Sequence, residues 1–90
     1  MQDNPDRRRF EVLVDGEVGG FATYRVRDRV VIVTHSEVDP RYQGQGLGSM
    51  LAKQTLDILR ERGARVVPAC PFFAEYVVKH PEYDAILEDG

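Results

Sequence analysis

The stretch Gln43-Gly44-Gln45-Gly46-Leu47-Gly48 decides the interpretation of this 90-residue chain. Its three glycines alternate with other residues directly before an amphipathic segment, and glycine permits unusual backbone angles and close approach of a ligand. The free N–H groups at a helix start, with the positive end of the helix dipole, suit an anion. The stretch therefore predicts an anion-binding loop, and a glycine-rich turn without a ligand is the plainer alternative.

The segment after the loop has the apolar period of a helix, from about residue 47 to residue 62. At ~100° per residue its apolar side chains fill one broad arc. These residues are Leu47, Met50, Leu51, Ala52, Leu56, Ile58 and Leu59. Gly63 is suited to end the helix. We expect this amphipathic helix to lie on a sheet.

Three strands are predicted before the loop. Apolar and polar residues alternate from Phe10, and Asp15-Gly16 is a strong hairpin-turn signal. Further strands are expected over residues 17–27 and 30–38, the last of them apolar on both faces at its start, as in a central strand. Pro40 ends that strand. The first half of the chain is therefore predicted to be an antiparallel meander.

After the helix, residues 64–68 read as a short strand, followed by a short helix over about 72–79 and a final turn over 82–87. A strand–helix–strand order implies a right-handed crossover and a parallel pair. The predicted fold class is therefore α/β (α+β), with one mixed sheet. We expect residues 1–8 to be a flexible tail and residues 9–90 to be a single domain.

Composition narrows the function. The net charge is −3, which disfavours nucleic-acid binding. No run approaches the ~20 apolar residues of a membrane span, and the N-terminus has no apolar signal segment. The only cysteine is Cys70, so an internal disulfide is impossible and a reducing, cytoplasmic setting is expected. We predict no metal site and no membrane partner.

Three kinds of phosphate loop compete for the glycine stretch. The ATP/GTP loop requires a lysine after its last glycine, whereas Gly48 is followed by Ser49. The dinucleotide loop requires an acidic residue at the end of the next strand, where this chain has Pro68. The third kind, Gln/Arg-x-x-Gly-x-Gly/Ala, binds the pyrophosphate of acetyl-CoA, and Gln43, Gly46 and Gly48 match it.

On these residues the sequence resembles the GNAT superfamily of acyl-CoA-dependent N-acyltransferases, and within it a minimal one-domain subgroup. The matching stretches are His35-Ser36-Glu37-Val38, Gly44-Gln45-Gly46-Leu47-Gly48, Val67-Pro68-Ala69-Cys70-Pro71-Phe72 and His80-Pro81-Glu82-Tyr83. The resemblance implies acetyl-CoA as the cofactor and transfer of an acetyl group to an amine. The acceptor, a small molecule or a protein, is not identified by it.

The resemblance also implies which residues bind the cofactor. Backbone N–H groups of the loop would hold the pyrophosphate, and the strand end at Glu37-Val38 would run beside the pantetheine arm. Arg41 is either a phosphate contact or an ordinary exposed loop arginine. The predicted cofactor-binding residues are Val38, Arg41, Gln43, Gly44, Gln45, Gly46, Leu47, Gly48 and Ser49.

Three residues are candidates for catalysis. Cys70 follows the last strand, where the resemblance puts the thioester, and is an acetyl-accepting nucleophile, a residue lining the acetyl site, or an inert core side chain. His35 and Glu37 are two apart on one strand and share a face, so either is a candidate base for an amine acceptor. The plainer alternatives are a hydrogen-bonded strand residue for His35 and a solvated strand end for Glu37.

The sequence departs from full-size GNAT proteins in one respect. Those carry two helices between the first two strands, which shape the acceptor site, and here Asp15-Gly16 leaves no room for them. The acceptor half is therefore largely absent or comes from a partner molecule, so both a monomer and a homodimer stay open. Two rival functions stay open. The first is a non-catalytic acyl-CoA-binding or sensing module, and the second is an interaction protein that keeps the fold without binding acyl-CoA.

Overall fold

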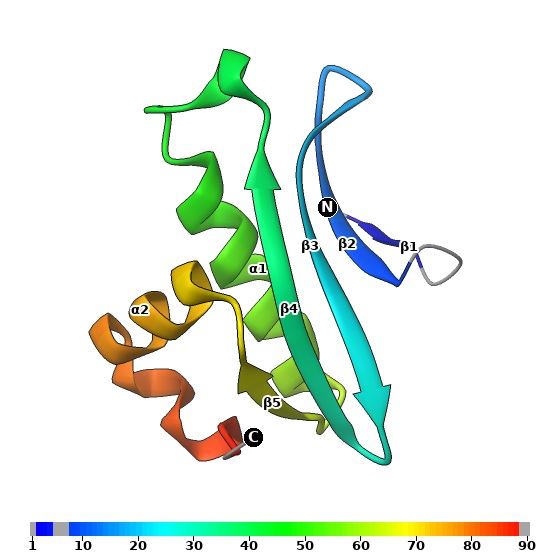
Figure 1. Ribbon diagram of the computed structural model, residues 1–90, viewed down its shortest axis with the longest axis vertical. Helices are drawn as coiled ribbons and strands as arrows, with labels where there is room; N and C mark the ends of the chain where they lie inside the picture. Colours follow the sequence, from blue (N-terminus) through cyan, green and yellow to red (C-terminus); the bar gives the residue numbers. More distant parts are fainter. Residues whose placement is uncertain (1, 5–7, 89–90) are drawn as a thin grey trace.

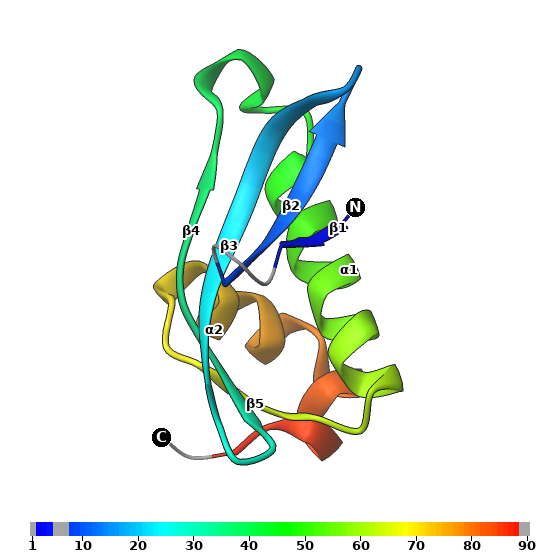
Figure 2. The same ribbon diagram turned by 90° about the vertical axis from the view of Figure 1, so that its right-hand side faces the viewer.

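The computed structural model of the protein describes residues 2–4 and 8–88, which form one five-stranded sheet with helices packed on it (Figures 1 and 2). The elements are β1 (Gln2–Asn4), β2 (Arg9–Val14), β3 (Glu17–Arg27), β4 (Val30–Val38), the 3₁₀ helix η1 (Pro40–Tyr42), α1 (Leu47–Glu61), β5 (Arg65–Pro68), α2 (Pro71–Lys79) and the 3₁₀ helix η2 (Pro81–Ile86). The strand order is β1-β2-β3-β4-β5, antiparallel as far as β4 and parallel between β4 and β5. The predicted mixed sheet with a crossover helix is confirmed.

The β2–β3 connection is as short as the sequence predicted. Asp15 and Gly16 have φ angles of 52° and 83°, both in the left-handed region. Two such residues make the mirror-image turn that fits the twist of a hairpin. No helix separates β2 from β3, and no helix among the described residues covers the face of these strands opposite α1 (Figure 2).

The N-terminus differs from the expected tail. Gln2–Asn4 pair with β2 as the edge strand β1, while residues 1 and 5–7 of that predicted tail lie outside the described residues. The Asp3 carboxylate accepts a hydrogen bond of 2.7 Å from the Tyr24 hydroxyl and pairs with Arg62 at 3.0 Å. Burial and the bond to Asp3 raise the pKa of Tyr24 to about 12. A three-residue polar edge strand pairs through its backbone, so no hydrophobic alternation announces it.

The core lies between α1 and the sheet. Leu51, Ala52, Leu56 and Leu59 on the helix are at most 2% exposed, as the predicted arc requires. Met50, at the margin of that arc, is 43% exposed, so the buried face of the helix is narrower than its apolar arc. No helix in the described part of the chain, α1 included, is long and apolar enough to cross a membrane.

A β-bulge interrupts the alternation of β4. Thr23 pairs with His35 and the next residue, Tyr24, pairs with Val33, so Thr34 is the extra residue. Val33 before the bulge is buried in the core. One inserted residue reverses which of the following side chains face the core. His35 is consequently exposed and the residue after it turns inward.

Beyond the bulge, β4 and β5 separate. Their parallel ladder runs from Val30 opposite Arg65 to Val33 opposite Pro68, where β5 ends. The Cys70 N–H donates to the Val33 carbonyl at 2.9 Å, and the chain then turns into α2 (Figure 1). Among the described residues, the last part of β4 has no strand beside it on this edge.

Candidate functional site

The glycine loop leads into α1 in a conformation that leaves donors free. Gly44 and Gly46 have φ angles of 82° and 76°, which L side chains rarely adopt, and Gly46 is the N-cap residue directly before α1. It supplies no capping side chain, and the first intrahelical bond runs from Met50 N–H to the Gly46 carbonyl. The N–H groups of the first turn therefore have no partner within the helix and suit an anion.

The third glycine of the loop serves packing instead. A Cβ atom on Gly48 would lie 3.2 Å from Cζ of Phe72 and 3.6 Å from Cγ2 of Val38. The start of α1 thus lies close to both β4 and α2. Gly48 keeps the anion-binding loop beside the open edge of β4.

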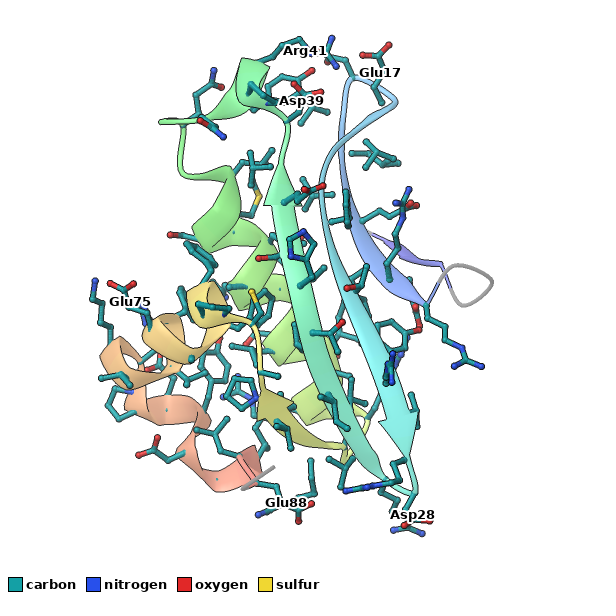
Figure 3. The ribbon with its side chains drawn as sticks, viewed as in Figure 1. Glu17, Asp28, Asp39, Arg41, Glu75 and Glu88 are labelled. Carbon is teal, nitrogen blue, oxygen red and sulfur yellow. The ribbon has the colours of Figure 1, made fainter. Side chains whose placement is uncertain are left out.

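Arg41 is held away from the loop glycines. Its guanidinium bonds Asp39 at 3.2 and 3.3 Å and approaches Glu17 at 3.4 Å, joining η1 to the β2–β3 hairpin (Figure 3). The hydrogen bond between the two side chains lowers the pKa of the Asp39 carboxyl group and raises the pKa of the Arg41 guanidinium. These contacts fit the exposed-arginine alternative, and a contact with a phosphate stays a prediction.

The open edge of β4 presents backbone groups. Asp39 N–H donates to the Gly19 carbonyl on β3 at 2.8 Å. Alternate residues of a strand direct their N–H and C=O groups to opposite neighbours. Val38 and Ser36 accordingly direct theirs to the side that β5 has left. These backbone groups could hydrogen-bond a ligand in place of a neighbouring strand, and the expected pantetheine arm is such a ligand.

Cys70 lies at the point where β4 and β5 separate. Its side chain is 3% exposed, and its Sγ atom lies 3.2 Å from Oγ of Ser36. It also precedes the first residue of α2, a helix of nine residues. Sequence reasoning missed Ser36, because regular alternation from Val33 would have turned it to the opposite face.

His35 and Glu37 lie together on the other face of β4. His35 Nε2 is 3.3 Å from Glu37 Oε1, and both side chains are about 60% exposed. The shared face predicted for them is confirmed, but the strand separates both from the thiol of Cys70. They line an open cleft of about 760 Å³, together with Arg9, Val18, Gly19, Gly20, Phe21, Ser36, Val38, Asp39, Pro40 and Gln43.

The aromatic residues of the C-terminal segment mostly secure the fold. Phe73 and Tyr83 are buried, and the Tyr83 hydroxyl donates to Asp57 at 2.7 Å. Phe72, in contrast, is 41% exposed. It borders a smaller hollow of about 150 Å³ beside Ser49 and Tyr76.

In residues 2–4 and 8–88 no group of three His, Cys, Asp or Glu side chains is arranged for a metal ion.

A phosphate-type loop beside a strand edge left open by its parallel neighbour defines the class of acyl-CoA-dependent N-acyltransferase folds. Residues 9–86 match the family model described as GCN5-related N-acetyl-transferase. The chain belongs to this family, which confirms the fold and the class of function predicted from the loop.

Relatives of known name agree with this membership. The chain is 29% identical over 83 residues to Protein NATD1 of Mus musculus, covering 90% of this chain and 76% of that protein. It is 34% identical over 65 residues to the streptothricin acetyltransferase of Streptomyces lavendulae, covering 69% of this chain and 34% of that enzyme.

Solved structures show the same fold. A GCN5-like protein of Staphylococcus aureus superposes with a TM-score of 0.70 at 22% identity, covering 92% of this chain and 83% of that one. The ribosomal-protein-S18-alanine N-acetyltransferase of Escherichia coli gives a TM-score of 0.59 at 31% identity over 66% of this chain. The chain spans 40% of that enzyme.

Proposed function

We propose that this protein binds acetyl-CoA and transfers its acetyl group to an amine. The observation that carries the proposal is the separation of β4 from β5 beside the anion-binding loop, with a thiol on one side of β4 and a His–Glu pair on the other. Donor and acceptor would then approach the same opening from opposite faces of the sheet. Family membership supports acetyl-CoA as the donor.

The donor is proposed to lie along the loop and the open edge. N–H groups from Gln43 to Ser49 would bind the pyrophosphate, because the helix start concentrates donors and positive potential there. The N–H groups of Gln43 and Gln45 donate to the carbonyls of Pro40 and Tyr42 in this structure, so the first turn of α1 would supply the main contacts. The backbone of Ser36 and Val38 would hydrogen-bond the pantetheine arm as a missing strand would. The thioester would then come close to Cys70.

In the transfer step the acceptor nitrogen attacks the thioester carbonyl. The new C–N bond forms, the C–S bond breaks, and CoA leaves as the thiolate that takes up a proton. The amine must be neutral to attack, so we assign the removal of its proton to the exposed pair His35 and Glu37. Acetyl-CoA supplies the activated acetyl group, and the protein supplies position and proton transfer.

Two roles are proposed for Cys70. In the first it lines the acetyl site as a small buried side chain, which its 3% exposure favours. In the second its thiolate takes the acetyl group from CoA, and the amine then attacks the enzyme-bound thioester. The hydroxyl of Ser36 at 3.2 Å and the start of α2 favour this second role.

One experiment tests the proposal and separates it from its rival. Calorimetry with acetyl-CoA measures binding, and mass spectrometry of the protein and of added amines measures transfer. We expect binding and acetylated amine; a protein that does not bind acetyl-CoA would overturn the proposal. Binding without transfer, hydrolysis or an acetylated residue would instead favour a non-catalytic acyl-CoA sensor, which the uncovered face of β2 and β3 makes the second candidate.

The setting of the reaction is also part of the proposal. We infer a cytoplasmic protein, because this reducing setting would keep its single cysteine, Cys70, as a thiol. We also infer that it has no nucleic-acid partner, because its net charge is −3. The protein would act as a monomer or as a homodimer, the second chain covering the acceptor face. Light scattering with and without acetyl-CoA distinguishes the two states.

A further inference from the structure

The cleft beside His35 and Glu37 carries an excess of negative charge. Asp39 and Glu17 share the single guanidinium of Arg41, and Glu37 pairs only with His35 among the interactions described for it. Of the described residues that line the cleft, Glu37 and Asp39 are acidic and Arg9 is basic. Arg9 is paired with Glu11, and Arg41 is shared by Asp39 and Glu17 outside the lining, so the carboxylates of the cleft are only partly balanced.

Among the described lining residues, the one Lys or Arg side chain is already engaged. Arg9 Nε lies 2.6 Å from Glu11 Oε2, and its guanidinium sits 4.6 Å from the centre of the Phe21 ring. Its side chain is 21% exposed. A negatively charged ligand would therefore meet the carboxylates of Glu37 and Asp39 and no unpaired guanidinium among the described lining residues.

The cleft also has an apolar part of its lining beside the carboxylates. Phe21 and Val18 line it, and Gly19 and Gly20 contribute backbone without side chains. Its volume of about 760 Å³ falls within the range of small-ligand sites. This arrangement suits a methylene chain with a polar group at each end.

We propose that the acceptor is an alkylamine carrying a second positive charge. This inference rests on the proposed function. The reacting amine would lie beside His35 and Glu37, and the second ammonium would lie beside Asp39, all three of which line the cleft. Glu37 and Asp39 are two residues apart, about 7 Å along an extended chain, which corresponds to a short methylene chain between the two nitrogens.

Charge complementarity gives this proposal its specificity. Carboxylates with too few cations attract a dication and repel a ligand carboxylate, and the attraction weakens as salt screens it. Monoamines would gain only part of the attraction. Amino acids of the same length would lose it.

The first test compares three acceptors of equal chain length: butylamine, 1,4-diaminobutane and 4-aminobutanoate. With a fixed concentration of acetyl-CoA, we expect kcat/KM for the diamine to exceed that for butylamine about tenfold at low ionic strength. The advantage should shrink in high salt. Equal efficiency for diamine and monoamine, or a preference for 4-aminobutanoate, would overturn the inference.

A matched pair of variants locates the effect. Asp39→Asn removes one charge while its amide oxygen still accepts the bond from Arg41 N–H, and Asp28→Asn makes the same change at the other end of the sheet (Figure 3). We expect selectivity for the diamine over butylamine to fall about fivefold in Asp39→Asn and to persist in Asp28→Asn. An equal fall in both variants would assign the selectivity to net charge and overturn the site.

Binding without chemistry keeps this inference separate from the proposed function. In NMR titrations without acetyl-CoA, the diamine should shift the amide signals of Phe21, Gly20 and Glu37, and 4-aminobutanoate should not. Diamine binding in a protein that fails to bind acetyl-CoA would count against the proposed function alone. Acetyl transfer without any preference for a second charge, or no diamine binding at these amides, would count against this inference alone.

Discussion

Oγ of Ser36 lies 3.2 Å from Sγ of Cys70, on the side of β4 that faces away from the His35–Glu37 pair. One strand thus carries a thiol contact on one face and an acid–base pair on the other. The opening between β4 and β5 joins the two faces, and each of the following predictions tests a part of this arrangement or of the fold that supports it.

Removing the Ser36 hydroxyl should slow acetyl transfer without unfolding the protein. Ser36→Ala takes away the contact that orients the Cys70 thiol, and the net loss of a hydrogen bond is worth about 1 kcal/mol, or roughly a fivefold lower kcat. Steady-state kinetics with circular dichroism as a folding control measures it. Ser36→Thr keeps the hydroxyl and should retain more of the rate; identical kcat values in all three proteins would contradict the prediction.

Replacing both His35 and Glu37 by Gln should lower kcat about 100-fold, because a positioned base contributes at least this much to proton transfer. The KM for acetyl-CoA should change little, since both side chains lie on the face opposite the proposed donor site. The pH–rate profile measured with the double variant checks the assignment. A profile that keeps its shape and height would place the base elsewhere.

Gly48→Ala should weaken acetyl-CoA binding and should be rescued by a second change. The added Cβ would lie 3.2 Å from Cζ of Phe72, so this exposed ring would have to shift by a few tenths of an ångström beside the loop that is proposed to bind the pyrophosphate. Gly48→Ala with Phe72→Leu removes the clash and should restore affinity. Calorimetry compares the single and double variants, and a double variant no tighter than Gly48→Ala would exclude steric crowding as the cause.

Thr55→Val should stabilise the fold by about 1 kcal/mol. Thr55 is fully buried on α1, and its hydroxyl has no hydrogen-bond partner among the described residues, so an isosteric methyl group removes an uncompensated polar atom. Urea unfolding measures the change. Thr23→Val is the matched control, because Thr23 shares a 2.9 Å hydrogen bond with Thr34 and its loss should not stabilise the fold.

Alkaline pH should destabilise the protein through Tyr24. Its pKa is raised from 10.0 to about 12 in the folded state, so the folded protein holds the phenol proton more tightly than the unfolded chain. That contribution is complete below pH 10 and is lost as the pH rises towards 12. Thermal unfolding between these values should show a shallower decline in Tyr24→Phe than in the native protein; parallel declines would contradict the assigned shift.

Much of the fold was predictable because its signals are local. The alternation in β2, the Asp15–Gly16 turn and the 3.6-residue period of α1 each depend on neighbours in sequence. The glycine loop was predictable for the same reason, since positive φ at Gly44 and Gly46 is a property of single residues. Strand β1 was not, because its pairing is a backbone contact between distant segments with no side-chain pattern.

The sequence alone determined that the chain has an anion-binding loop at a helix start, a mixed sheet and no helices between β2 and β3. The tertiary structure decided which side chains meet near this loop and on the two faces of β4. The bulge at Thr34 reverses the alternation of β4, and through that reversal Ser36 meets Cys70 while His35 faces the cleft. A bulge depends on how two strands pair, and strand register is fixed only when the whole sheet packs against its core.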